Sequence, residues 1–355
     1  AKDGGVFVPK LASNPGTTDG DWIFRGFGLN TSQFYGADKQ PGAARYIGGM
    51  QDNGTRFSPE DEEASSVSNY QFALGGDGFE AIWNSKDPSQ LLGSIYNGQL
   101  FRSEDHGKTW VDATSGLVAG SEFGFVTRLA NSKDFPNRVF TVGNQGVYVS
   151  DNFGRSWTRT TISENFSAPS GSAIFHDVEV SRANANIVWA GSGMFNSATQ
   201  RFLHVSTDGG KTFSPTNNFN DAAMGTITKL ATHPTEENTA YALFSFAKAP
   251  KILRTTDRGQ TWEDISGFGT GSASTNGFPD VAVYCLYVRP DNPDIIWAGT
   301  EIGIVESLDN GQTWASIPDF AKVSVWDMKG QDNEVVIATH GRGIWTATID
   351  TDQIH

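Results

Sequence analysis

A motif that recurs along the chain constrains its fold more than any other feature. The pattern Ser/Thr-x-Asp-x-Gly-x-Thr-aromatic occurs four times, and a fifth copy carries Asn at the acidic position. The acidic or amide residues of the five copies are Asp105, Asn152, Asp208, Asp257 and Asp309. The copies end at Trp110, Trp157, Phe213, Trp262 and Trp314, so neighbouring copies lie 47, 56, 49 and 52 residues apart. Self-similarity at this spacing predicts a repeat architecture.

Each copy of the motif predicts a tight hairpin turn. An Asp or Asn side chain accepts hydrogen bonds from backbone N–H groups of its own turn, and the Gly supplies a position with positive φ. The aromatic residue then begins the next strand and packs against a neighbouring sheet. We therefore assign the recurring Asp or Asn a structural role, because a residue that returns in every repeat serves the repeat.

Short strand patterns surround each motif. An apolar run of strand-like composition occurs seven times, starting at Tyr46, Leu92, Val139, Ile187, Tyr241, Ile296 and Val336. A second β-rich run precedes most of these, and no segment has the 3.6-residue periodicity of a helix. Each repeat is thus four strands, a to d, with the motif at the c–d turn. Four strands in about 50 residues, repeated seven times, predict an all-β, seven-bladed β-propeller of four-stranded antiparallel blades in a single domain, residues 1–355.

The last repeat ends without a strand d, which leaves its sheet one strand short. The segment Asp21–Arg25 has the composition of such a strand. We expect it to pair with Gly343–Ala347 and close the last blade, because closure removes an exposed sheet edge. A further strand-like segment, Gly5–Val8, is then left over. It is either an accessory strand or a sign that the chain is a fragment of a longer protein.

Charge and composition exclude several classes of function. The formal net charge is −14, whereas nucleic acids and anionic membranes attract basic surfaces. No run of about 18 apolar residues is present, so we expect no membrane insertion. The single cysteine, Cys285, excludes an intrachain disulfide framework and a cysteine-rich zinc site. No signal peptide is visible, and the abrupt start at Ala1 is what a processed or a truncated N-terminus would give.

The motif resembles that of the Asp-box (bacterial neuraminidase repeat) propellers, over nearly the whole chain. The segments Gly48–Thr55, Gly75–Phe79 and Ala338–Trp345 look like those of the sortilin/xyloglucanase-like subset of large secreted bacterial proteins. The resemblance implies a secreted or cell-surface location and further domains of a parent protein. The superfamily contains sialidases, xyloglucan-cleaving glycoside hydrolases, sortilin-type receptors and a photosystem II assembly factor, so the motif is specific for the fold rather than for a function.

In a propeller the b–c and d–a loops share the face opposite the c–d turns, and we expect ligands there. The polar candidates in these loops are Asp52, Asp77, Glu80, Asp177, Glu301, His340 and Arg342. Two of them, Asp52 and Asp77, lie in glycine-rich settings and are the candidates for a pair of catalytic carboxylates. The alternatives are that both form turns, or that they bind a structural cation such as calcium. No other cofactor is expected.

Two functions from different classes remain open at this point. The first is a non-catalytic binding or scaffold module for a protein or glycan ligand. The second is a glycoside hydrolase of the xyloglucanase-like kind, or the carbohydrate-binding half of one. A receptor-like propeller with a peptide in its channel is a third. A sialidase is disfavoured because the Arg-Ile-Pro segment of that family is absent near the start, and the basic patch of the assembly factor does not fit a charge of −14.

Overall fold

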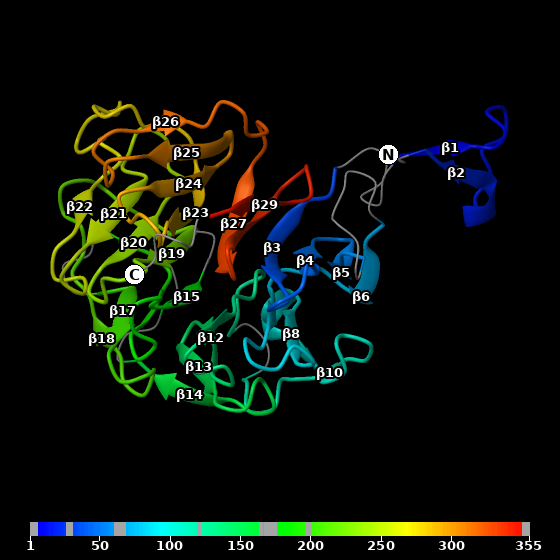
Figure 1. Ribbon diagram of the computed structural model, residues 1–355, viewed down its shortest axis with the longest axis horizontal. Helices are drawn as coiled ribbons and strands as arrows, with labels where there is room; N and C mark the ends of the chain where they lie inside the picture. The colour runs from blue at the N-terminus through cyan, green and yellow to red at the C-terminus, as the bar shows by residue number, and fades with distance from the viewer. Residues whose placement is uncertain are drawn as a thin grey trace.

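The computed structural model describes residues 6–25, 31–59, 69–118, 122–162, 166, 176–195 and 200–349. Seven antiparallel sheets stand around a central axis, and a separate hairpin precedes them (Figure 1). No α-helix occurs in these ranges, only two short 3-10 turns at Asp19–Asp21 (η1) and Tyr96–Gly98 (η2). The predicted seven-bladed β-propeller is confirmed.

The strands follow the chain from blade to blade. Blade 1 contains β3 (Phe34–Lys39), β4 (Tyr46–Met50), β5 (Gly54–Phe57) and β6 (Gln71–Leu74). Blade 2 contains β7 (Ala81–Trp83), β8 (Leu91–Ser94), β9 (Leu100–Ser103) and β10 (Val111–Asp112). Blade 3 contains β11 (Ala130–Asn131), β12 (Val139–Gly143), β13 (Gly146–Ser150) and β14 (Thr158–Thr161). Blade 4 contains β15 (Asp177–Val180), β16 (Val188–Gly191), β17 (Leu203–Ser206) and β18 (Ser214–Pro215).

The remaining blades continue the same order. Blade 5 contains β19 (Lys229–Thr232), β20 (Ala240–Leu243), β21 (Ile252–Thr255) and β22 (Glu263–Asp264). Blade 6 contains β23 (Val283–Val288), β24 (Ile296–Thr300), β25 (Gly303–Ser307) and β26 (Ala315–Ser316). Blade 7 contains β27 (Val325–Gln331), β28 (Glu334–Thr339) and β29 (Ile344–Thr348). All seven predicted b strands are therefore found, as β4, β8, β12, β16, β20, β24 and β28.

The innermost strand of every blade is strand a. First strands of neighbouring blades contact each other around the ring, as β3 does with β7 and β27. The apolar cores lie between blades: Trp83 of blade 2, for example, packs with Ile47 and Phe57 of blade 1. Outer strands such as β10, β18 and β26 are exposed. The fold is thus stabilised by burial of sheet faces against the next blade.

The five predicted motif turns all have the expected geometry. In the turn of blade 2, Asp105 Oδ1 accepts the backbone N–H of Thr109 at 2.9 Å, and Oδ2 accepts the Thr109 hydroxyl at 2.6 Å. The Gly residues of the five turns have φ between 78° and 85°. Trp157 Nε1 donates to the carbonyl of Ala113 in the preceding blade at 2.7 Å, so the closing aromatic also joins blades. These side chains complete turns and link neighbouring sheets.

The predicted closure of the last blade by Asp21–Arg25 is wrong. Strand β2 (Trp22–Phe24) pairs instead with β1 (Phe7–Pro9), with Phe7 opposite Phe24 and Pro9 opposite Trp22. This hairpin lies to one side of the ring (Figure 1). Blade 7 accordingly has three strands in the described part of the chain. The physical reason is proximity in sequence, because closing a short loop costs less conformational entropy than pairing with a strand over 300 residues away.

Blades 1 and 7 are joined mainly by side chains. Lys39 Nζ lies 3.1 Å from Asp332 Oδ2 and 3.5 Å from Glu334 Oε2, and the Tyr46 hydroxyl donates to Glu334 at 2.9 Å. The carbonyl of Ser32 also accepts the backbone N–H groups of residues 341 and 343 at 3.0 and 3.3 Å. The ring therefore closes through ion pairs, hydrogen bonds and the packing of β3 on β27.

Candidate functional site

Seven side-chain rings form a continuous cluster at one end of the central channel, where the b–c and d–a loops lie. We call it the aromatic cluster, and its members are Tyr35, Phe79, Tyr96, Phe125, Tyr284, Trp326 and His340. They come from blades 1, 2, 3, 6 and 7 or the loops that join them. Phe125 is 48% exposed, and most of the others are partly exposed. The cluster is thus an apolar surface around the mouth of the channel.

Stacking arranges one half of this cluster. The indole of Trp326 stacks with Tyr284, with centroids 4.7 Å apart, and with His340, with centroids 4.8 Å apart. Both contacts are close to parallel, at 17° and 22°. Tyr35 meets the same indole edge-on at 4.7 Å. Three other rings therefore pack against the partly exposed indole of Trp326.

Irregular strand pairing positions three of these rings. The register of β3 skips Tyr35, that of β23 skips Tyr284 and that of β27 skips Trp326. Each is the second residue of its strand and follows a buried apolar residue. A β-bulge leaves one residue out of the ladder and redirects its side chain. In three innermost strands, a β-bulge thus turns an aromatic side chain toward the mouth of the channel.

The predicted pair Asp52 and Asp77 lies beside the aromatic cluster. Asp77 Oδ1 accepts the backbone N–H of Asp52 at 2.8 Å, and Asp52 has a φ of 61°. Burial, followed by the charges of Asp77 and Asp52, raises the pKa of Tyr35, whose hydroxyl donates to Gln51 at 2.8 Å. The contact between the two aspartates is thus a turn hydrogen bond of the kind expected for turn formers.

Three more predicted residues lie in loops at this end. Glu301 is exposed, accepts the backbone N–H of Ala282 at 3.3 Å, and adds to burial in raising the pKa of Tyr284. His340 belongs to the aromatic cluster, and burial lowers its pKa. Arg342 is exposed, and its backbone N–H donates to Thr339 Oγ1 at 3.0 Å. Glu301 thus adjoins the rings, and His340 is one of them.

Glu80 and Asp177, in contrast, are buried inside the channel. They belong to a group that we call the channel charge network: Glu80, Arg128, Asp177, Lys229, Asp327 and Lys329. Glu80 Oε1 lies 2.9 Å from Arg128 Nη1, and Glu80 Oε2 lies 2.8 Å from Lys329 Nζ. Asp177 Oδ1 lies 3.8 Å from Arg128 Nε. These two carboxylates are therefore structural charges rather than members of the exposed face.

In this network the cost of burying each charge is offset by its attraction to charges of opposite sign. Burial acts to raise the pKa of Glu80, but the charges of Lys329, Lys229 and Arg128 outweigh it and hold that pKa below its usual value. For Asp177 burial prevails, and the pKa is raised to about 6. Asp327 contacts Lys229 directly and lies 3.4 Å from Lys329. Every cation of the network therefore has a carboxylate partner, as buried charges require.

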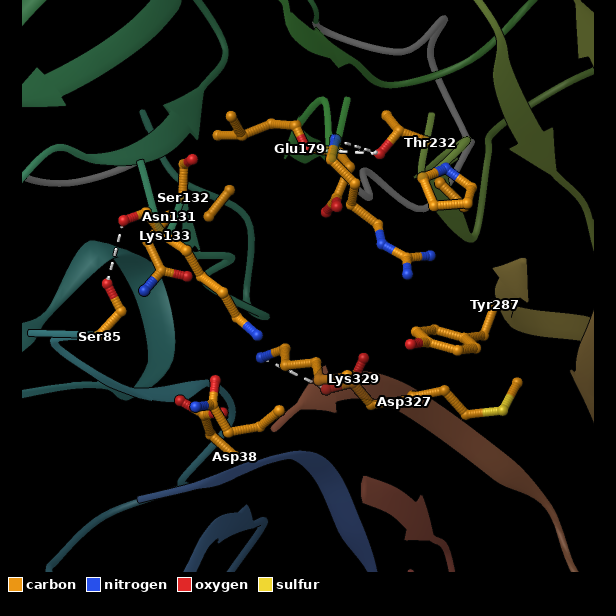
Figure 2. A pocket seen from close by; sticks show the side chains of 18 of the residues that line it. Asp38, Ser85, Asn131, Ser132, Lys133, Glu179, Thr232, Tyr287, Asp327 and Lys329 are labelled. Carbon is orange, nitrogen blue, oxygen red and sulfur yellow. Dashed lines mark hydrogen bonds and ion pairs between the residues drawn. The ribbon is translucent and has the colours of Figure 1, made fainter. Parts of the chain in front are cut away.

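A cavity of about 420 Å³ opens at the opposite end of the channel, on the side of the a–b turns. All seven blades contribute to its wall, and Asp327, Lys229 and Lys329 lie on its side of the charge network. Figure 2 shows Lys133, Lys329, Glu179 and Tyr287 extending around this space. None of the site residues predicted from the sequence is among the described residues that line this cavity. No single motif marks the cavity, because each blade supplies only a few of its residues.

Of the aromatic cluster, only His340 was predicted as a site residue. A usable signal exists: Phe34-Tyr35, Val283-Tyr284 and Val325-Trp326 each begin strand a of a blade with an apolar residue and then an aromatic one. In the described ranges, no group of three or more His, Cys, Asp or Glu side chains is arranged to hold a metal ion. Nor does any described helix have the length and apolarity needed to cross a membrane.

Comparisons with known proteins agree with this architecture. The family model described as "Sortilin-Vps10: Sortilin, neurotensin receptor 3" matches residues 98–221. Together with the seven blades, this match decides the type of fold. The chain is a seven-bladed β-propeller. No curated protein matches the chain by sequence.

Solved structures with this propeller fold include enzymes and binding proteins. The GH74 xyloglucanase from Xanthomonas campestris aligns with a TM-score of 0.59 and 17% identity, over 98% of this chain and 47% of the enzyme. YCF48 from Cyanidioschyzon merolae aligns with a TM-score of 0.62 and 13% identity, over 90% of this chain and 96% of that protein. YCF48 bound to D1 peptide aligns at 0.60, with 12% identity, over 91% and 93% of the two chains. The propeller spans about half of the xyloglucanase, and these identities establish the fold alone.

Proposed function

We propose that this propeller is a non-catalytic binding module, secreted or at the cell surface, that takes a protein segment at the aromatic end of its channel. The observation that carries the proposal is the set of three bulged aromatic residues, Tyr35, Tyr284 and Trp326. Bulges interrupt ladder hydrogen bonds and concentrate near functional sites. Three blades carry a bulge that turns an aromatic ring toward the same end of the channel. This repetition supports a role in forming a binding surface rather than in stabilising the fold.

Exposed apolar groups extend this surface beyond the aromatic cluster. Phe246 in the b–c loop of blade 5 is 38% exposed, and Ile302 in the b–c loop of blade 6 is 43% exposed. Phe125 lies at the same end of the ring. Large apolar side chains grouped on one face are typical of protein-interaction sites.

The chemistry of the face favours a protein segment over a glycan. A sugar stacks on a free aromatic face, whereas Trp326 already stacks with Tyr284 and His340. Ring edges and half-exposed rings instead suit apolar side chains. Asp52, Asp77 and Glu301 place negative charge beside these rings, which favours basic side chains. The expected ligand is therefore an extended segment that combines apolar and Lys or Arg residues.

The comparisons support this proposal at the level of the fold. A solved structure of similar architecture is titled YCF48 bound to D1 peptide, so a propeller of this shape is compatible with a peptide ligand. The likeness to a sortilin family model and to xyloglucanases supports a location outside the cytoplasm. Further domains of a parent protein are part of the proposal, since the chain matches only half of the enzyme's length.

A second candidate is a glycoside hydrolase, or the carbohydrate-binding half of one. One observation favours it: almost the whole chain, 98%, aligns with one part of a xyloglucanase. Retaining and inverting glycosidases need two carboxyl groups across a cleft, one of them able to hold a proton near neutral pH. Asp77 instead bonds the backbone of Asp52. The binding module is therefore the better-supported function.

The test is binding of the purified chain to two arrays, one of peptides that vary in aromatic and basic content and one of plant and animal glycans. We expect binding to peptides that carry both apolar and basic residues. The variants Trp326→Ala and Phe125→Ser should lose it, and Phe125→Ser should keep the unfolding temperature because that side chain is about half exposed. The matched control is Trp345→Ala, which removes an exposed aromatic group on β29. Binding only to glycans, or equal loss in all three variants, would overturn the proposal.

A further inference from the structure

We propose that the cavity at the a–b end of the channel is a second binding site, for a small multivalent oxyanion. This site is independent of the aromatic cluster. The two sites lie at opposite ends of the channel, and the channel charge network lies between them. The cavity holds about 420 Å³, which suits a compact organic or inorganic anion rather than a folded partner.

Two cations in the cavity wall have no described carboxylate within ion-pair distance, although the charges of Asp332 and Asp38 act on one of them, Lys133. Among the described residues no salt bridge involves Lys133 or Arg182, although the other cavity lysines, Lys39, Lys229 and Lys329, each have one. In a chain with a net charge of −14, two unpaired cations that face one cavity are unexpected. An anionic ligand would supply the missing partner.

The positions of both cations suit a ligand in the cavity. Arg182 lies with its guanidinium carbon 4.3 Å above the Tyr287 ring, and its Nη1 donates to the carbonyl of Val288 at 2.8 Å. These contacts hold the guanidinium in place at the cavity wall. Lys133 extends into the cavity (Figure 2), and burial lowers its pKa. A bound anion would offset that cost of burying the ammonium group.

A third wall residue, Glu179, adds a hydrogen-bond donor. Burial, and then the charge of Asp177, raises the pKa of Glu179 to about 8. The charged groups that act on it are Asp177 on its own strand, Lys229 on β19, and Asp327 and Lys329 on β27. At pH 7 Glu179 is therefore mostly a neutral acid that can donate its proton to an oxygen of the ligand. Above pH 8 it becomes an anion and repels the ligand.

Sulfate, phosphate and citrate share the chemistry that this wall recognises, namely several oxygens and a charge of two or more. The first experiment is isothermal titration calorimetry of the full chain with each of the three at pH 7 and constant ionic strength. We expect at least one to bind, and Lys133→Gln and Arg182→Gln each to weaken that binding roughly tenfold. Comparing the three anions separates phosphate-type from polycarboxylate ligands.

The matched control is Lys108→Gln, which removes a lysine from a c–d turn outside the cavity wall. It should bind as the unaltered chain does. The proposal is overturned if none of the three anions binds more tightly than about 10 mM. It is overturned equally if Lys108→Gln weakens binding as much as Lys133→Gln, since the effect would then be one of general surface charge.

The second experiment follows sulfate affinity from pH 7 to pH 9.5, where the charge of sulfate is constant. Asp38, whose pKa burial raises to about 6, is mostly ionised through most of this range. Affinity should fall as the pH rises through about 8, and Glu179→Gln should remove most of that fall. Any fall that remains belongs to Lys133, whose pKa is lowered. An unchanged fall in Glu179→Gln would overturn the role assigned to this acid.

Discussion

Lys329 of blade 7 donates a hydrogen bond to Glu80 of blade 2 at 2.8 Å, across the channel. Blade 1 lies between these two blades, so the contact links sheets that are not neighbours in the ring. Arg128 extends the link to blade 3, and Lys229 lies 4.0 Å from the same carboxylate. The carboxylate of Glu80 therefore joins four innermost strands or the loops that lead into them.

Replacing Glu80 with Gln should destabilise the whole ring. The substitution leaves Lys329, Lys229 and Arg128 buried with one carboxylate fewer, and breaking a buried ion pair by removing one partner costs about 3–5 kcal/mol. Urea unfolding followed by tryptophan fluorescence measures this free energy. The matched control is Glu104→Gln, which breaks an exposed pair with Arg155 and should cost less than about 1 kcal/mol. Equal costs would contradict the role of Glu80.

The variant Asp208→Ala should lower stability by about 1–2 kcal/mol, because the turn loses the acceptor for two backbone N–H groups and two hydroxyls. Asp208→Asn should cost less, since Asn152 makes the equivalent bonds in blade 3. Thermal unfolding of the three proteins provides the comparison. If the alanine variant melts with the unaltered chain, the turn bonds contribute no measurable stability.

The hydrogen bonds of Asp208 also predict that the stability of the fold depends on pH. Burial acts to raise the pKa of Asp208, but the hydrogen bonds from Thr212 outweigh it and lower the pKa to about 2. A lowered pKa means that the carboxylate stabilises the fold above pH 4, and that this contribution is lost as the pH falls toward 2. The stability difference between the unaltered chain and Asp208→Asn should therefore shrink between pH 5 and pH 2. A constant difference over that range would contradict the assignment.

Removal of residues 1–25 should leave the melting temperature of the ring within about 2 °C. The reason is that β1 pairs with β2, and neither adds a strand to blade 7. Differential scanning calorimetry of the truncated chain tests this. A decrease of about 5 °C or more would mean that the segment supports the ring in another way.

The purified chain should not hydrolyse xyloglucan, mixed-linkage glucan or sialylated glycans. Asp77 is engaged as an acceptor for the Asp52 backbone, so it is placed to shape a loop rather than to transfer protons. Release of reducing sugar and of sialic acid are the measurements, with Asp52→Asn and Asp77→Asn alongside. Turnover that either substitution abolishes would make this propeller a glycosidase.

The sequence was sufficient for the blade count, the strand order and the geometry of the five motif turns. The reason is that these depend on local interactions repeated in every unit: Asp105 bonds Thr109, four residues away, just as Asp309 bonds Thr313. It also placed Asp52, Asp77, Glu301 and His340 at one end of the ring, because strand alternation alone sends b–c and d–a loops to the same face. The same short-range hydrogen bonds and strand order therefore recur from repeat to repeat and can be predicted from the sequence of each one.

Only the tertiary structure separated Glu80 and Asp177 from that exposed group, since their burial depends on Arg128, Lys229 and Lys329 arriving from other blades. The aromatic cluster and the cavity are likewise formed by residues from several blades. Residues far apart in sequence, such as Tyr35 and Trp326, come into contact at the central axis. The pairing of β2 with β1, in contrast, is local, because the short loop between them costs less entropy than pairing with the last blade. Sequence periodicity determines what each blade is, and the closure of the ring determines which side chains meet at its centre.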